Sequence, residues 1–106
     1  MKVLYREAAK NDIVRQFRYY LLTVDSPQVA LRFRDAVRRT IALLRERPHV
    51  GAHYRSEAEQ LRNMRSWPVN GFESIRIYYL LEDETVQVIR ILHGSRDIER
   101  ALATQG

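Results

Sequence analysis

Residues 72–93, "FESIRIYYLLEDETVQVIRILH", decide the fold because they combine two alternating apolar runs with one short polar break. Alternation of apolar and polar side chains is typical of a strand with one buried face. The break at 82–84, "EDE", is short enough for a tight hairpin. The sequence therefore predicts strands over 72–81 and 85–93 that pair with each other in antiparallel fashion.

The loop length determines which side chains share a face of this hairpin. A two-residue loop at Asp83 and Glu84 would pair Glu82 with Thr85. The expected core face then carries Ile75, Ile77, Tyr79, Leu81, Val86, Val88, Arg90 and Leu92. The expected opposite face carries Ser74, Arg76, Tyr78, Leu80, Gln87, Ile89, Ile91 and His93.

This register brings polar side chains together near the end of the second strand. Arg76 would lie diagonal to His93, about 7–8 Å away at Cα, with Tyr78 on the same surface. One interpretation is a small polar site at the open end of the sheet. The other is that His93 and Arg96, in "HGSRD", only satisfy carbonyl groups at the strand end.

The first half of the chain predicts a strand followed by two helices. Residues 2–5 form a short apolar run, and 7–24 and 27–47 carry apolar side chains at helical spacing. Ser26 is suited to cap the second helix and Pro27 to begin it. Pro48 and Gly51 end that helix. Two helices joined by a few residues favour an antiparallel hairpin.

The remaining segments complete an α+β domain. We expect a loop over 48–60, a strand over 61–69 that Pro68 ends or places near an edge, and a short helix or tail after Asp97. The order predicts one domain, 1–106, with an N-terminal strand and a two-helix hairpin on a small antiparallel sheet. Its three C-terminal strands form a meander. The face opposite the hairpin would be left to solvent or a partner.

Composition narrows the function classes. The chain of 106 residues has a net charge of +5, with 16 arginines against two lysines, Lys2 and Lys10. The charge favours an acidic partner, although a GC-rich genome also explains the arginine preference. The absence of cysteine excludes disulfides and thiol catalysis and favours the cytoplasm. The N-terminus resembles neither a signal peptide nor a membrane span.

Few catalytic chemistries fit the sequence. His49 and His53 have a spacing that suits a metal on a helix, but Pro48 and Gly51 predict a loop there, so we expect no metal site. The glycines have no phosphate-loop spacing, and no cofactor is expected. Metal-independent RNA cleavage by arginine, histidine and tyrosine side chains remains compatible with the sequence. The competing hypothesis is a binding module without chemistry.

The stretch "IRIYYLLEDETVQVIRILHGSRD" resembles the closing hairpin of the ParE/RelE toxin superfamily and is most similar to its ParE branch. The segments "AAKNDIVRQFRYY", "VALRFRDAVRRTIALLRERPHVG" and "LRNMRSWPV" resemble the first helix, second helix and second strand of that family. The resemblance implies the fold derived above and a toxin of a type II toxin–antitoxin module.

The resemblance also implies a choice of target. ParE-like members are described as inhibitors that trap DNA gyrase on cleaved DNA, whereas RelE-like members cleave mRNA in the ribosome. Arg76 and Arg96 match arginines of RelE-type nucleases, but the RelE tyrosine falls near Leu102, and "RNMRSW" lacks the expected lysines. We therefore expect a gyrase inhibitor. The alternative is a metal-independent endoribonuclease that uses Arg76, His93 and Arg96.

The same resemblance implies the partners. We expect a ParD-like antitoxin that folds an acidic segment over the toxin, with no membrane and no sequence-specific nucleic-acid binding by the toxin alone. First-helix residues outside the core and residues 72–78 are candidates for antitoxin contact. The expected residues for binding target or antitoxin are Arg65, Trp67, Arg76, Tyr78, His93 and Arg96.

Overall fold

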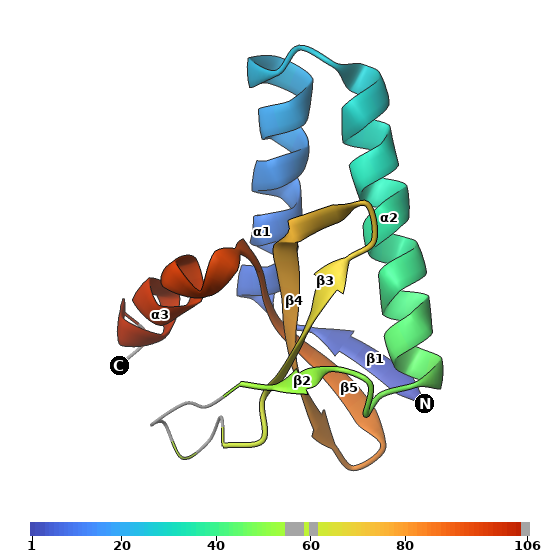
Figure 1. Ribbon diagram of the computed structural model, residues 1–106, viewed down its shortest axis with the longest axis vertical. Coiled ribbons are helices and arrows are strands. Elements are labelled where there is room, and N and C mark those ends of the chain that lie inside the picture. Colours follow the sequence, from blue (N-terminus) through green and yellow to red (C-terminus); the bar gives the residue numbers. More distant parts are fainter. Residues whose placement is uncertain (55–58, 60–61, 105–106) are drawn as a thin grey trace.

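A helical hairpin packs on one face of a five-stranded sheet, and a C-terminal helix lies apart from that hairpin (Figure 1). The computed structural model describes residues 1–54, 59 and 62–104. The elements are β1 (Lys2–Tyr5), α1 (Glu7–Arg18), η1 (Tyr19–Thr23), α2 (Pro27–Glu46), β2 (Ala52–His53), β3 (Arg65–Val69), β4 (Phe72–Glu82), β5 (Thr85–His93) and α3 (Gly94–Thr104). The α+β fold and the order of its main elements are confirmed.

The sheet is mixed, with strand order β1-β5-β4-β3-β2. The three meander strands pair in antiparallel fashion as predicted, but β1 runs parallel to β5, so the expectation of a wholly antiparallel sheet is wrong. Strand β2, inside the predicted 48–60 loop, adds a two-residue edge that sequence patterning missed. The strand predicted over 61–69 begins at Arg65, and residues 60 and 61 lie outside the described residues.

The predicted first helix is α-helical only as far as Arg18 and then widens into the π-helical turn η1. The Val24 amide bonds to the Tyr19 carbonyl at 3.0 Å, five residues back, which is the π-helical pattern. Asp25 follows with φ of 59°, so the chain reverses direction between the helices. Ser26 then caps α2, because its hydroxyl accepts a 3.2 Å hydrogen bond from the Val29 amide.

Replacing Ser26 with alanine is expected to lower the free energy of unfolding by about 1 kcal/mol, because the Val29 amide loses its acceptor at the first turn of α2. Urea unfolding followed by circular dichroism measures this loss. Thr23→Ala, at an exposed hydroxyl of η1, is the control and is expected to change stability much less. Equal effects of the two substitutions would contradict a specific capping role.

The β4–β5 register changes once along the hairpin. Asp83 and Glu84 have φ of 49° and 59°, which confirms a two-residue loop of the I′ kind. The predicted pairing holds from Glu82↔Thr85 to Tyr79↔Val88, then shifts by one, so that Tyr78 pairs with Arg90. Ile89 is the extra residue of a β-bulge, which a pattern of alternation does not reveal.

The bulge exchanges the faces of the residues that follow it. Ile91 belongs to the core on the hairpin side, whereas Leu92 lies in a separate cluster, so both predicted face assignments are wrong. Arg90 still reaches the hairpin, through Asp12 of α1. Arg76 pairs with Leu92 and His93 pairs with Ile75, so alternation no longer places His93 on the same face as Arg76.

Two apolar clusters stabilise the two faces of the sheet. The larger cluster joins α1 and α2 to the strands and contains Ala9, Phe33, Ala36, Val37, Ile41, Leu44, Val69, Ile75, Ile77, Tyr79, Val86, Val88 and Ile91. The smaller one contains Met64, Tyr78, Leu80, Ile89, Leu92, Ile98 and Ala101. Because Ile98 and Ala101 belong to α3, this helix covers part of the face that was expected to remain open.

Candidate functional site

Arg76 and Tyr78, two of the predicted site residues, lie on β4, and Tyr78 packs against α3. Tyr78 is only 1% exposed and donates a 3.2 Å hydrogen bond to the Gly94 carbonyl at the start of α3. Burial raises the pKa of the Tyr78 phenol, outweighing the opposite effect of Arg76. A buried, neutral phenol is a structural donor here, and it is poorly suited to act as a general base at neutral pH.

Arg76 is engaged with the neighbouring strand. Its Nε and Nη2 donate to the Ser66 hydroxyl of β3 at 3.2 and 3.0 Å. Ser66 is buried and pairs with Tyr78 across the β3–β4 ladder. The Arg76 guanidinium is half-buried at this surface, so it can meet an anionic group of a partner while one hydroxyl holds it in place.

Among the described side chains, His93 does not complete an acid–base site with Arg76. The His93 side chain is exposed at the last residue of β5. Arg96 and Leu102 fall within α3, but their side chains lie outside the described part of the chain. The predicted cluster of Arg76, Tyr78 and His93 is thus not a single catalytic surface, and its members have three different environments.

Arg65, at the start of β3, stabilises the turn at residues 48–51, which follows α2. Its Nη1 donates to the carbonyls of His49 and Gly51 at 3.0 and 2.8 Å. The hydroxyl of the buried Tyr79 also bonds to this turn. It donates to the Pro48 carbonyl at 2.7 Å and accepts from the Gly51 amide at 3.0 Å. Arg65 therefore has a structural role in shaping the 48–51 turn.

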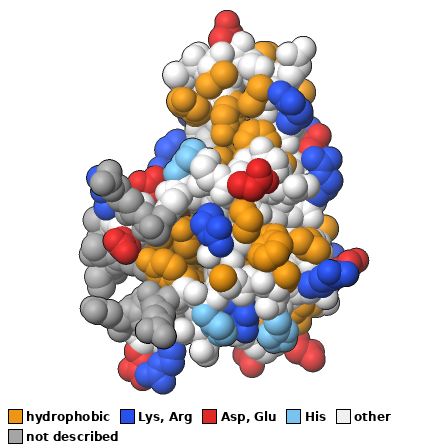
Figure 2. Space-filling model, viewed as in Figure 1, with side chains coloured by type: hydrophobic (Ala, Val, Ile, Leu, Met, Phe, Trp, Pro, Cys, Tyr) orange, Lys and Arg blue, Asp and Glu red, His pale blue; other side chains and the backbone are white. Residues whose placement is uncertain are grey.

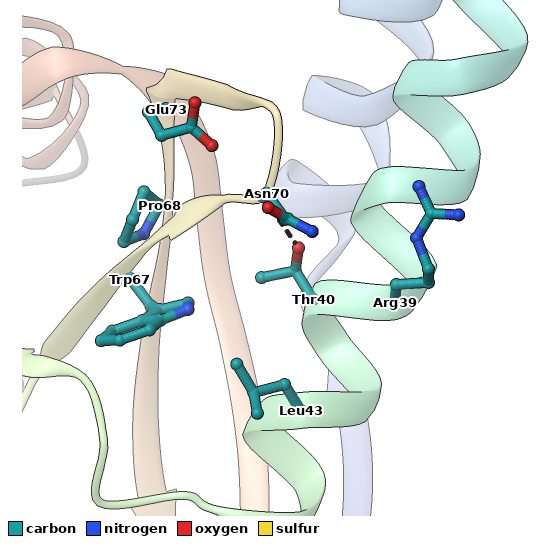
Figure 3. Close-up of a pocket in the computed structure, with 7 residues that line it drawn as sticks. All are labelled: Arg39, Thr40, Leu43, Trp67, Pro68, Asn70 and Glu73. Carbon is teal, nitrogen blue, oxygen red and sulfur yellow. Dashed lines mark hydrogen bonds between the residues drawn. The ribbon is translucent and has the colours of Figure 1, made fainter.

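Trp67 lines a pocket between β3 and α2 (Figure 3). The pocket has a volume of about 390 Å³ and is lined by Arg39, Thr40, Leu43, Trp67, Pro68, Asn70 and Glu73. Figure 3 shows Trp67 and Pro68 on the strand side, with Leu43 and Thr40 on the helix side. A 3.1 Å hydrogen bond from the Asn70 amide to the Thr40 hydroxyl holds the two sides together. Its mixed lining suits side chains of a protein partner.

Sequence reasoning missed the most strongly bonded group, the carboxylate of Asp12 on α1. Asp12 is fully buried and accepts hydrogen bonds from Arg90 Nε and Nη2 at 2.8 and 2.9 Å. Arg15 Nη2 donates to it at 2.6 Å, and the Ile91 amide donates at 2.9 Å. The hydrogen bond to Asp12 raises the pKa of Arg90 in spite of burial. The sequence offered one signal of this contact, namely Arg90 within a largely apolar strand. A charged side chain that becomes buried needs an oppositely charged or hydrogen-bonding partner.

Asp12 and Gln16 together cover the edge of β5 beyond the end of β1. Asp12 accepts from the Ile91 amide, and Gln16 Nε2 donates to the Ile91 carbonyl at 2.8 Å. The two side chains thus form the hydrogen bonds to the Ile91 backbone that a neighbouring strand would otherwise form. The helix is thereby locked to the sheet at a fixed position, which sets the direction of the helical hairpin.

Large apolar side chains are exposed at the far end of that hairpin. The hairpin patch consists of Tyr19, Leu22, Val24 and Leu31, and Leu22 is 71% exposed. Figure 2 shows hydrophobic side chains gathered over this end of the molecule, beyond the sheet. An apolar patch rimmed by charged residues is typical of a protein-binding surface.

Neither a membrane-spanning helix nor a cluster of metal ligands occurs among the described residues, 1–54, 59 and 62–104. No helix there is long and apolar enough to cross a membrane. No group of three or more histidine or carboxylate side chains there has the arrangement needed to hold a metal ion.

Comparisons with known proteins identify the relatives of this chain. The family profile described as "ParE toxin of type II toxin-antitoxin system, parDE" matches residues 3–98. A solved structure described as "Chromosomal ParDE TA system from P. aeruginosa" has a similar fold, with a TM-score of 0.70 and 17% sequence identity. That alignment covers 88% of this chain and 95% of the other. No individually curated protein matches significantly.

Proposed function

The chain belongs to the ParE toxin family of type II toxin–antitoxin systems, and from this premise we propose that it inhibits DNA gyrase by binding and is neutralised by a ParD-like antitoxin. One observation carries the proposal. The described structure offers an exposed apolar hairpin patch on a basic chain, while Arg76, Tyr78 and His93 are not assembled for acid–base chemistry. Such a surface suits association with another protein.

Purified toxin added to a gyrase supercoiling reaction tests the target. We expect loss of supercoiling and accumulation of cleaved DNA, both reversed by an equimolar amount of the antitoxin encoded beside this chain. Relaxation by an unrelated topoisomerase is the control and is expected to continue unchanged. Full supercoiling at a large excess of toxin would refute gyrase as the target.

The hairpin patch is the surface we assign to the antitoxin. Replacing Leu22 with aspartate is expected to weaken antitoxin binding by at least about tenfold, because a charge then enters an interface that should bury this exposed leucine. Isothermal titration calorimetry measures the change. Thermal unfolding of the free toxin is expected to stay near wild type, since most of the Leu22 side chain is already exposed to solvent.

Val14→Asp tests whether antitoxin contact extends along α1, because first-helix residues outside the core are also candidates for that contact. Val14 is also exposed and apolar, but it lies on α1 closer to the sheet and outside the hairpin patch. It is expected to bind antitoxin within about twofold of wild type. If Val14→Asp weakens binding as much as Leu22→Asp does, the antitoxin surface is not confined to the end of the hairpin.

An endoribonuclease of the RelE type is the second candidate. It is favoured by a single observation, the half-buried Arg76 beside Ser66 on β3, from where it can meet an anionic group such as a phosphate. The variants Arg76→Ala and His93→Ala test it through growth inhibition and mRNA cleavage in cells. Full growth inhibition by both variants, with intact mRNA, excludes this function and leaves gyrase inhibition standing.

A further inference from the structure

Two pockets lie next to each other along α2, on the side of β3 and of the turn at residues 70–71. The first is the Trp67 pocket of about 390 Å³ described above. The second has a volume of about 350 Å³ and is lined by residues of α2 and of that turn, with Phe72 at the start of β4. Arg39 and Asn70 line both pockets. The two pockets therefore form one groove, here called the α2–β3 groove.

Regularly spaced side chains of α2 form one wall of the α2–β3 groove. They are three or four residues apart and so share one face of the helix, namely Val29, Arg32, Ala36, Arg39 and Leu43. Trp67, Pro68 and Phe72 form the sheet wall. Figure 3 shows Trp67 and Leu43 on opposite sides of the groove, with Arg39 to one side on α2. The groove thus combines an apolar floor with exposed cations at its rim.

The charges that line the groove are those of two arginines and one glutamate. Neither Arg32 nor Arg39 has a hydrogen-bond or ion-pair partner for its guanidinium within the described part of the chain. The Glu73 carboxylate, in contrast, accepts a hydrogen bond from the Gly71 amide of the neighbouring turn. The groove therefore has two cations available to a partner, and its one carboxylate is already bonded within the protein.

The backbone beside the groove is poorly suited to pair with an added strand. Strand β2 already pairs with Arg65 and Ser66, and Pro68 has no amide hydrogen to donate. The Asn70 amide is bonded to the Thr40 hydroxyl at 3.1 Å. A partner in this groove is therefore held through side chains that it presents from a helix or a turn, and not through backbone pairing.

The lining indicates which side chains the partner presents. Arg32 and Arg39 are seven residues apart on α2, which corresponds to about 10 Å along the helix. Two carboxylates at a similar separation would meet both guanidinium groups. A large apolar side chain fits between Trp67 and Leu43. Nucleic acid would use the arginines but leave this apolar floor exposed, so an acidic protein segment is favoured.

We propose that the α2–β3 groove binds the target of the toxin, by receiving an acidic helix or turn of the target protein with one large apolar side chain between Trp67 and Leu43. This inference rests on the proposed function, in which the target is gyrase. It concerns a surface other than the hairpin patch assigned to the antitoxin. Leu31 of that patch and Arg32 of the groove are consecutive in α2, so a bound antitoxin would obstruct one end of the groove.

The variants Arg39→Glu and Arg38→Glu of the full-length toxin form a matched pair for the test. Both arginines are exposed on α2 and both substitutions change the net charge equally, but Arg38 lines a different pocket, beside β1. Arg39→Glu is expected to raise the toxin concentration needed for half-maximal inhibition of gyrase supercoiling at least about tenfold, and Arg38→Glu less than about threefold. Equal effects in the two variants, or none, would overturn the inference and leave gyrase inhibition by wild-type toxin intact.

Glu73→Gln gives a change of opposite sign, which damage to the fold does not produce. The amide oxygen of glutamine still accepts from the Gly71 amide, while the one negative charge of the groove is removed. Inhibition of supercoiling is expected at a toxin concentration about twofold to threefold lower than for wild type. Weaker inhibition by Glu73→Gln would contradict an acidic occupant.

Two binding measurements distinguish the other possible occupants. Isothermal titration calorimetry is expected to show antitoxin binding by Arg39→Glu within about twofold of wild type, and a tenfold loss would assign the groove to the antitoxin instead. Fluorescence anisotropy with a labelled DNA duplex is expected to show no binding that depends on Arg39, and such binding would assign its cations to nucleic acid. Either result would overturn the inference, whereas failure of wild-type toxin to inhibit gyrase would refute the proposed function together with it.

Discussion

Replacing Asp12 with asparagine is expected to lower the free energy of unfolding by about 3–5 kcal/mol, which is the cost of removing one partner of a buried ion pair. The Arg90 guanidinium would lose the carboxylate that accepts two of its hydrogen bonds, and only 13% of that side chain is exposed to water. Asparagine keeps the shape but turns one acceptor into a donor that faces other donors. Urea unfolding followed by circular dichroism measures the change.

Asp35→Asn is the matched control for Asp12→Asn. The Asp35 carboxylate is about half exposed on α2, and its ion-pair partner is Arg34 Nε at 3.7 Å. Its replacement is expected to change stability by no more than about 0.5 kcal/mol. A loss below about 1 kcal/mol for Asp12→Asn would show that the buried carboxylate is not what locks α1 to β5.

Replacing Gly51 with alanine is expected to destabilise the fold by about 3 kcal/mol. A Cβ at this position would lie 2.8 and 2.9 Å from Cε1 and Cζ of Tyr79 and closer still to its hydroxyl oxygen. Tyr79 cannot retreat, because it is fully buried and its hydroxyl is bonded to Pro48 and Gly51. The expected loss combines overpacking with disrupted buried hydrogen bonds. Thermal unfolding measures it as a fall in Tm.

Gly71→Ala separates this steric effect from a general effect of losing glycine. Gly71 has φ of 84°, so alanine is strained there, but no atom lies within 4 Å of the new methyl group. The expected cost is about 1 kcal/mol, from backbone strain alone. If Gly51→Ala costs no more than Gly71→Ala, contact with Tyr79 does not determine the choice of glycine at position 51.

Local signals in the sequence were sufficient to predict most secondary-structure elements. Alternation located β4 and β5, and helical spacing with the Ser26-Pro27 pair located the start of α2. These features depend on residues that are neighbours in the chain, so the hydrophobic pattern and the local structural propensities of the sequence predict them directly. The two-residue hairpin loop at Asp83 and Glu84 was predictable for the same reason.

Features that depend on distant residues could not be predicted from the same patterns. The parallel pairing of β1 with β5 joins segments separated by both helices, and β2 is too short for a period to be visible. Val88, Ile89, Ile91 and Leu92 on both sides of the bulge are all apolar, so the hydrophobic pattern of this segment does not reveal where the register shifts. A single extra residue nevertheless exchanged the faces of Ile91 and Leu92.

The candidate site was predictable only in part. Arg76, Tyr78 and Trp67 do lie on adjacent strands, β3 and β4, but the hydrogen bonds that define their environments come from Ser66 and Gly94 and were not visible in the sequence. Arg65 bonds the turn at His49 and Gly51, a contact that the sequence did not predict, and its role in binding a target or antitoxin stays a prediction. Which role a surface arginine takes depends on carbonyl groups that only the folded turn presents.

The β1–β5 pairing also governs the order in which this protein can fold. Strand β1 and the Asp12 carboxylate come early in the chain, yet their partners, including Ile91, lie 79 residues later in the case of Asp12. During synthesis, the first helix leaves the ribosome well before these partners exist. A domain closed by such distant contacts folds more slowly than a helical bundle of the same size. The sheet and the buried Asp12 site are therefore complete only after the residues up to Ile91 have been made.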